Sequence, residues 1–199
     1  MNEPRNEPRN TQVGEKKLVI LQTIAEMLER PAAEKVTTAL LARQMNVSEA
    51  ALYRHFASKA QMYEGLIEFI EGGVFSVIGQ IESAEESGLK QAEAIVASLL
   101  RFAQKNRGLT RVLVGDALVH ENPRLQARIN QLLDRIEATL KQCLKIAVAQ
   151  GTLGTEHDCS AHANLLVCYT LGRWQRFVKS GFKEDPLAQW SVQWPLLAR

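Results

Sequence analysis

Residues 37–59 hold side chains whose types and spacing suit an anionic, grooved partner; the stretch reads TTALLARQMNVSEAALYRHFASK. Hydroxyl groups stand at its start, hydroxyl and cationic groups stand near its end, and the adjacent pair Ala50 and Ala51 lies between them. Hydroxyl and cationic groups bind nucleic-acid phosphates, while a helix with small side chains can approach base edges. The candidate DNA-binding residues are Thr37, Thr38, Ser48, Glu49, Ala50, Ala51, Tyr53, Arg54, His55 and Lys59.

These residues have different expected roles. The methyl groups of Ala50 and Ala51 could touch the thymine methyl group, and the Arg54 guanidinium could read guanine or hold a phosphate. The Ser48 hydroxyl is placed to cap the start of a helix, and Glu49 lies beside the positive end of its dipole. The expected phosphate ligands are Thr37, Thr38, Tyr53, His55 and Lys59.

The element that must position these side chains fits a helix-turn-helix. Ala42 is small where two helices would press together, Asn46 tolerates a left-handed turn, and Leu52 supplies a core contact of the second helix. From this pattern alone, the segment could also be a helical hairpin without a DNA-binding role. The expected small core consists of Leu41, Met45, Val47, Leu52 and Phe56.

The rest of the chain shows helical periodicity, and no stretch alternates long enough to indicate a strand. Helices are predicted over 15–29, from Ser58 onward through two glycines, over 90–105 and 109–120, from Asn122 to about 150, and over 156–181. Residues 1–14 carry a tandem NEPR repeat and are expected to form a flexible arm; 83–88 and 186–198 are expected to be irregular. The predicted all-α chain thus has an arm (1–14), a helix-turn-helix domain (15–60) and a helical body (61–199).

Composition and charge narrow the class of protein. With 199 residues, 46% of them hydrophobic, the chain is too short for a large multidomain enzyme. No apolar run approaches the ~20 residues of a membrane span, and the first ten residues lack a signal-peptide core, so we expect a cytoplasmic protein. The net charge of +2 falls within residues 1–60, which carry nine Lys and Arg against seven Asp and Glu. The cationic excess therefore coincides with the predicted DNA-binding domain.

Other reactive side chains form no recognisable catalytic or metal site. Asp116 and His120, four residues apart, are interpreted as a local helix pair rather than an acid–base couple. The motifs GxSxG, GxxxxGK[ST] and HExxH are absent, and three scattered cysteines make no disulfide framework. We therefore expect no enzyme activity, no cofactor and no metal. We also expect no metal at one cluster of possible ligands, because its spacing fits no common zinc pattern. The cluster consists of His157, Asp158, Cys159 and His162.

The segment LYRHFxSK, at 52–59, closely resembles the end of the DNA-binding domain in tetracycline-repressor (TetR) type regulators. The resemblance implies a three-helix DNA-binding domain, a fourth helix that begins at Ser58 and Lys59, and a dimerising helical body. A two-fold homodimer mirrors a palindromic DNA site. The apolar seam at 125–143 and the aromatic segment at 169–177 could form either the dimer interface or a ligand pocket.

Further stretches resemble a specialised branch of this family, the nucleoid-occlusion factors. They are SEAALYRHFASK, LIEFIE, KNRGLTRVL and GDALVHENPRLQARINQLLDRIEATL, with RFVKSGFK and QWPLLA near the end. The resemblance implies a nucleoid-associated homodimer that, on DNA, antagonises assembly of the cell-division GTPase FtsZ. The contact residues it implies are Phe69, Lys105 and Asn106. This chain departs from the pattern at Val77, Ser98 and Arg101.

Local chemistry gives these three positions a second interpretation. Lys105 complements a helix dipole and Asn106 tolerates a left-handed cap, so the two residues could be an ordinary helix end. Phe69 could be a core residue. For the whole chain, the alternative function is a TetR-type transcriptional repressor controlled by a small-molecule effector.

Overall fold

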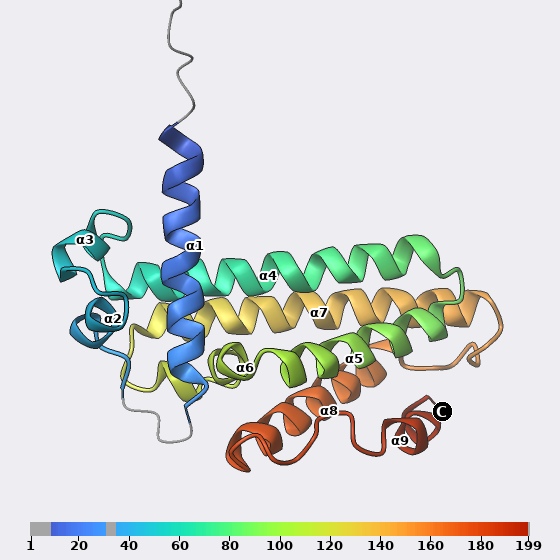
Figure 1. Ribbon diagram of the computed structural model, residues 1–199. Helices are drawn as coiled ribbons and strands as arrows, with labels where there is room; N and C mark the ends of the chain where they lie inside the picture. Colours follow the sequence, from blue (N-terminus) through green and yellow to red (C-terminus); the bar gives the residue numbers. More distant parts are fainter. Residues whose placement is uncertain (1–8, 31–34, 199) are drawn as a thin grey trace, which may run out of the picture.

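The computed structural model describes residues 9–30 and 35–198, and every regular element in those ranges is a helix (Figure 1). We call the first three helices the head: α1 (Arg9–Leu28), α2 (Thr38–Gln44) and α3 (Glu49–Tyr53). The others form the body: α4 (Lys59–Ala84), α5 (Gly88–Lys105), α6 (Arg107–Leu113), the 3-10 helix η1 (Asp116–Leu118), α7 (Pro123–Ala149), α8 (Cys159–Lys179) and α9 (Trp190–Leu197). The predicted all-α class is confirmed for the described ranges.

Side-chain caps fix where several helices begin. The Thr37 hydroxyl accepts a hydrogen bond from the Leu40 N–H at 3.1 Å, and Ser58 caps α4 in the same way. The Asn122 side chain accepts from the Arg124 N–H at 3.1 Å, directly before the proline that opens α7. Each bond satisfies a backbone donor that has no partner within its own helix, so local sequence determines these boundaries.

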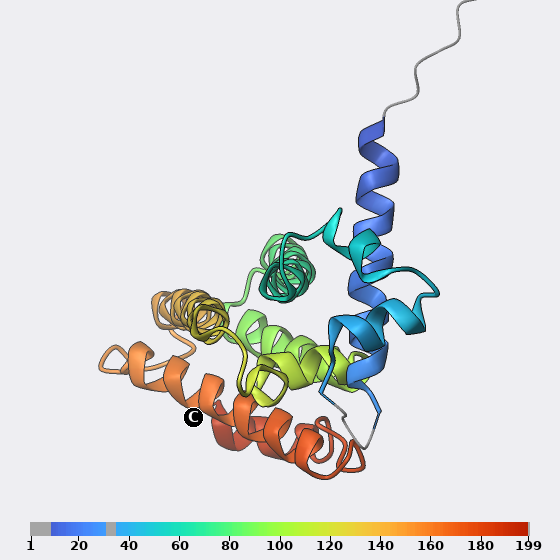
Figure 2. The same cartoon turned by 90° about the vertical axis from the view of Figure 1, so that its left-hand side faces the viewer.

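The body is a bundle in which α5 contacts α4, α7 and α8 (Figure 2). Trp174 of α8 is 1% exposed, and its indole N–H donates to the Leu99 carbonyl of α5 at 3.1 Å. Because the polar N–H is satisfied, the large ring can be buried and holds α8 against α5. Among residues 9–30 and 35–198, no helix is both long and apolar enough for a membrane span. The predicted seam of α7 is buried at Leu125, Ile129, Leu132, Ile136, Leu140 and Cys143.

The head rests on the body where α1 contacts α6 and crosses the start of α4 (Figure 1). Gly108 in α6 makes this approach possible. A Cβ atom at that position would lie 2.0 Å from the Ala25 backbone oxygen and 2.9 Å from the Ala25 carbonyl carbon. Only a residue without a side chain fits such a backbone-to-backbone contact, so Gly108 sets how the head is seated.

The start of α1 differs from the prediction. The helix begins at Arg9, so residues 9–14 of the predicted flexible arm are helical, while residues 1–8 lie outside the described ranges. The amphipathic part of α1 packs on the body, and this packing stabilises the helix. Adding residues to an existing helix costs little, and no proline interrupts the segment RNTQVG.

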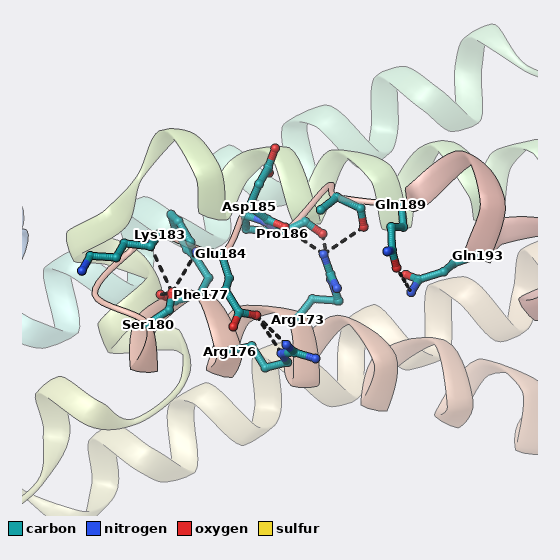
Figure 3. A network of polar contacts seen from close by, with 11 residues as sticks. Arg173, Arg176, Phe177, Ser180, Lys183, Glu184, Asp185, Pro186, Gln189 and Gln193 are labelled. Atoms are coloured by element: carbon teal, nitrogen blue, oxygen red, sulfur yellow. Dashed lines mark hydrogen bonds and ion pairs between the residues drawn. The ribbon is translucent and has the colours of Figure 1, made fainter.

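The predicted irregular end at 186–198 was wrong, because it contains α9. Trp194 of this helix is 7% exposed, although Pro195 removes a backbone donor inside it. The Arg173 guanidinium of α8 fixes the preceding connection by donating three hydrogen bonds, at 2.8 to 3.0 Å, to backbone carbonyls within 185–188 (Figure 3). This anchoring and the burial of Trp194 stabilise a helix that its own sequence does not favour.

Candidate nucleic-acid interface

The turn between α2 and α3 has the predicted geometry. Asn46 adopts a left-handed backbone with a φ of 54°, and the Val47 N–H donates to the Ala42 carbonyl at 2.9 Å. Ala42 and Leu52 are 4% and 1% exposed where the two helices meet. The helix-turn-helix is therefore confirmed in its backbone and in its contact residues.

Val47 does not join the small core, contrary to the prediction. It is 42% exposed and lines a groove of about 310 Å³ between α1 and α3, together with Val19 and Ala51. Because it directly follows the left-handed residue, its side chain leaves the contact between α2 and α3. Leu41 and Phe56 are buried there as expected.

Three predicted DNA-binding residues form a polar network across α2 and α3. Thr38 Oγ1 donates to Glu49 Oε2 at 2.6 Å, and the Tyr53 hydroxyl donates to Thr38 Oγ1 at 3.4 Å. Ser48 caps α3 by accepting the Ala51 N–H at 3.2 Å. The Glu49 carboxylate thus orients two hydroxyl groups on the surface, and the cap fixes the direction in which α3 leaves the turn.

The ten candidates do not share one surface. Thr37, Ala50, Tyr53 and Arg54 are exposed, whereas Ala51 and His55 are part-buried. Both part-buried residues line the groove between α1 and α3. Arg54 is exposed but also lines this groove, so it lies at the edge between the groove and the exposed surface that carries Ala50 and Tyr53.

Lys59, a predicted phosphate ligand, is already engaged. Its ammonium forms an ion pair with the carboxylate of Glu121, which lies between η1 and α7, and stands 5.5 Å from the Tyr63 ring centroid. The two charged side chains are 22% and 11% exposed. Burial, and secondarily the charge of Glu121, raises the pKa of Tyr63, so its phenol stays protonated. Sequence reasoning missed Glu121 because 62 residues separate it from Lys59 and no local pattern relates them.

A second groove brings two of the three partner-surface candidates together. Phe69 is 48% exposed and lines a groove of about 420 Å³ with Asn106. Asn106 joins α5 to α6, and its side-chain amide donates to the Phe102 carbonyl at 2.8 Å. Lys105 is exposed but does not line the groove. The α1 residues that complete the groove, which sequence reasoning missed, are Leu18, Leu21, Gln22, Ala25, Glu26 and Glu29.

Comparisons with known proteins identify the family of both the head and the body. Residues 86–199 match the model of the SlmA-like, tetracyclin repressor-like C-terminal domain, and residues 20–66 match that of the tetR family of bacterial regulatory proteins. A nucleoid occlusion factor SlmA from Alteromonas mediterranea is 47% identical over 175 residues, or 88% of this chain and 90% of that protein. The chain belongs to the SlmA family of TetR-type regulators. Another SlmA, from Marinomonas sp., is 44% identical and covers 94% of each chain.

Solved structures confirm the TetR-like architecture of this SlmA-family chain. A TetR transcription regulator from Haloarcula marismortui superposes with a TM-score of 0.79, at 15% identity, over 93% of this chain and 97% of that chain. FadR from Bacillus subtilis, solved with stearoyl-CoA, gives a TM-score of 0.75 at 16% identity over 91% and 97% of the two chains. At these identities the likeness establishes the fold alone.

The predicted helix pair of Asp116 and His120 was wrong. The 3-10 helix η1 ends before His120, which adopts a left-handed φ of 67°. Asp116 Oδ2 instead lies 3.7 Å from Nε of Arg111, which is 6% exposed. The pair fails because η1 ends at Leu118 and the left-handed His120 lies beyond it, so no helical turn joins the two residues.

The cluster at 157–162 lies at the start of α8. Nε2 of His157 is 2.8 Å from Nδ1 of His162, and burial lowers the pKa of His162. Asp158 caps the helix by accepting the Ala161 and Ser160 N–H groups, which lower the pKa of its carboxyl. Within residues 9–30 and 35–198, no three possible metal ligands converge.

Proposed function

We propose that this chain is a nucleoid-occlusion factor: a homodimer that binds palindromic DNA through its heads and, when bound, antagonises assembly of FtsZ. The observation that carries the proposal is the attachment of a helix-turn-helix with an exposed α3 surface to an SlmA-family body. Relatives named nucleoid occlusion factors align with most of the chain at 43 to 48% identity.

The DNA contact is assigned to α3, entering the major groove. Ala50 is small and exposed, so it lets the backbone approach the base edges, and Arg54 lies at the C-terminal end of the helix to bind guanine or a phosphate. Thr37 supplies a hydroxyl donor for a phosphate, and Tyr53 supplies another when its long bond to Thr38, at 3.4 Å, is given up. Glu49, held by Thr38, has a carboxylate that can accept from the cytosine amino group.

The dimer contact is assigned to α7 and α8. Leu165 of α8 is 52% exposed, and a groove of about 430 Å³ between the two helices is lined by Leu133, Leu171 and Gly172 among others. Burying such apolar surface against a second copy forms a four-helix interface. A two-fold axis there would place the two α3 helices on successive half-sites.

The FtsZ contact is assigned to the groove at Phe69. Its apolar lining includes Leu18 and Leu66, and Lys105 directly precedes Asn106 at its edge. Arg101, one helical turn before Lys105 on α5, is a second exposed cation. The apolar lining suits apolar side chains of a partner segment, and the two cations beside the groove suit its carboxylates. Glu26 and Glu29 on the α1 wall are exposed carboxylates, so the acidic part of such a segment must lie on the α5 side.

Sedimentation of FtsZ polymers in GTP, with and without a duplex selected by this protein, tests the proposal. The wild-type protein with duplex should reduce the sedimented FtsZ. Phe69→Ala should restore sedimentation while keeping DNA affinity, and Arg54→Ala should impair DNA binding and polymer inhibition together. Val192→Ala, at a 69% exposed apolar position on α9, is the matched control and should change neither.

If the wild-type protein leaves the amount of sedimented FtsZ unchanged both with and without the duplex, the proposal is wrong. In that case, release of the duplex by a small molecule would favour the ligand-controlled repressor.

A further inference from the structure

The contacts between α4 and α7 reverse their polarity at the end nearest the head. Along the body, α4 supplies carboxylates and α7 supplies cations: Arg124 pairs with Glu64 at 2.7 Å, and Arg128 pairs with Glu71 at 3.0 Å. At the first residue of α4 the order changes, because Lys59 is the cation and Glu121, just before α7, is the carboxylate. Packing of α4 on α7 alone does not require this reversal.

Lys59 stands where a phosphate ligand is expected. It opens α4 directly after the head, and the N-terminal end of a helix carries a partial positive charge that attracts phosphates. The cap residue Ser58 and the exposed Arg54 lie close by in sequence, on the side of the molecule that carries α3. Like a DNA phosphate, the Glu121 carboxylate carries negative charge and acceptor oxygens. In the free protein it forms an ion pair with the Lys59 ammonium.

We propose that Glu121 is an autoinhibitory carboxylate, which holds Lys59 in place of a DNA phosphate and must release it when the head closes on a duplex. This inference rests on the DNA binding proposed above. Since the two side chains are mostly shielded from water, their attraction is screened less by salt than that of an exposed pair. DNA must displace this carboxylate, so Lys59 contributes less to DNA affinity than an unpaired lysine would.

The Glu121→Gln variant tests the inference by freeing the ammonium while keeping the shape of the side chain. One extra phosphate contact steepens the log–log salt dependence of binding by about 0.9, which raises affinity roughly eightfold at 0.1 M salt for each protomer. The gain should be the same on a selected and on a scrambled duplex, because a phosphate contact carries no sequence information. Fluorescence anisotropy over a salt series measures both quantities.

A double-mutant cycle makes the test specific. Lys59→Ala should cost less than twofold in the wild-type background and the full roughly eightfold in the Glu121→Gln background. Glu64→Gln, which breaks the Arg124 pair at the same α4–α7 contact, should leave DNA affinity unchanged. Thermal unfolding of each variant checks that the fold is intact.

The possible failures are distinguishable. If the wild type binds DNA and Glu121→Gln binds equally or more weakly, Glu121 positions Lys59 rather than competing for it, and the inference is overturned. An equal cost of Lys59→Ala in both backgrounds would overturn it as well. If neither protein binds any duplex, the proposed function and the inference fall together.

Discussion

Replacing Gly108 by alanine should weaken the packing of the head against the body and destabilise the protein. The new Cβ would lie 2.0 Å from the Ala25 oxygen and 3.2 Å from the Leu28 Cβ. Carbon atoms pack best at separations of roughly 3.5 Å, so α6 would have to retreat by about 1.5 Å from α1. The two closest atoms, the Ala25 oxygen at 2.0 Å and the Ala25 carbonyl carbon at 2.9 Å, belong to the backbone of α1, so no rotamer change can relieve the contact.

The expected loss combines two opposing effects. Alanine gains about 1 kcal/mol over glycine in helix propensity, whereas overpacking costs typically ~1–3 kcal/mol and more where backbone must move. A net destabilisation of about 2 kcal/mol should lower Tm by roughly 4–8 °C in a chain of this length. Thermal unfolding followed by circular dichroism at 222 nm measures the change.

Gly79→Ala is the matched control for this prediction. Gly79 also lies in a helix, α4, but a Cβ there would meet no atom within 4 Å. Propensity alone should then stabilise the protein by about 0.5–1 kcal/mol. A Gly108→Ala protein that melts at or above the wild-type temperature would show that the close approach of α6 to α1 is not what holds the head.

Three further results are expected. Ser48→Ala should cost about 1 kcal/mol by removing the α3 cap and should weaken DNA binding, whereas Ser48→Asp, with an acceptor of its own, should retain stability in urea unfolding. Arg54→Ala should cost about 1–3 kcal/mol of affinity for a selected duplex in anisotropy; unchanged affinity would mean that α3 does not face DNA. The lowered carboxyl pKa of Asp158 stabilises the fold above the unfolded pKa of about 3.9, and this contribution is lost as pH falls through the folded value. The Tm advantage of wild type over Asp158→Asn should therefore shrink as pH falls below about 4, and a difference that stays constant there would contradict the assignment.

Sequence predicted the elements whose causes are local. Ser48, Ser58 and Asn122 mark helix starts through hydrogen bonds to backbone donors two or three residues away. Thr37, which was predicted only as a phosphate ligand, caps α2 in the same way. The left-handed turn at Asn46 depends on the residue type itself. Such signals act within a few residues, so they can be recognised in the sequence without knowledge of the tertiary fold.

The rest depends on contacts between distant parts of the chain. The ion pair of Lys59 with Glu121 joins residues with no common motif. The five-residue α3 is too short for periodicity to fix its rotation, so sequence did not separate Ala51 from Ala50. The helix around Trp194 forms because burial and the Arg173 hydrogen bonds outweigh a proline.

The groove at Phe69 has walls from both halves of the molecule, α1 on one side and α4 with Leu109 on the other. Any segment seated there touches the half that carries α3 and the half that carries α7 and α8. If the angle between the two halves differs between the free and the DNA-bound protein, the affinity for this segment differs as well, and a bound segment favours one of the two angles. Thermodynamic reciprocity follows: whatever a duplex does to the strength of such an association, the associated segment does to the strength of duplex binding by the same factor.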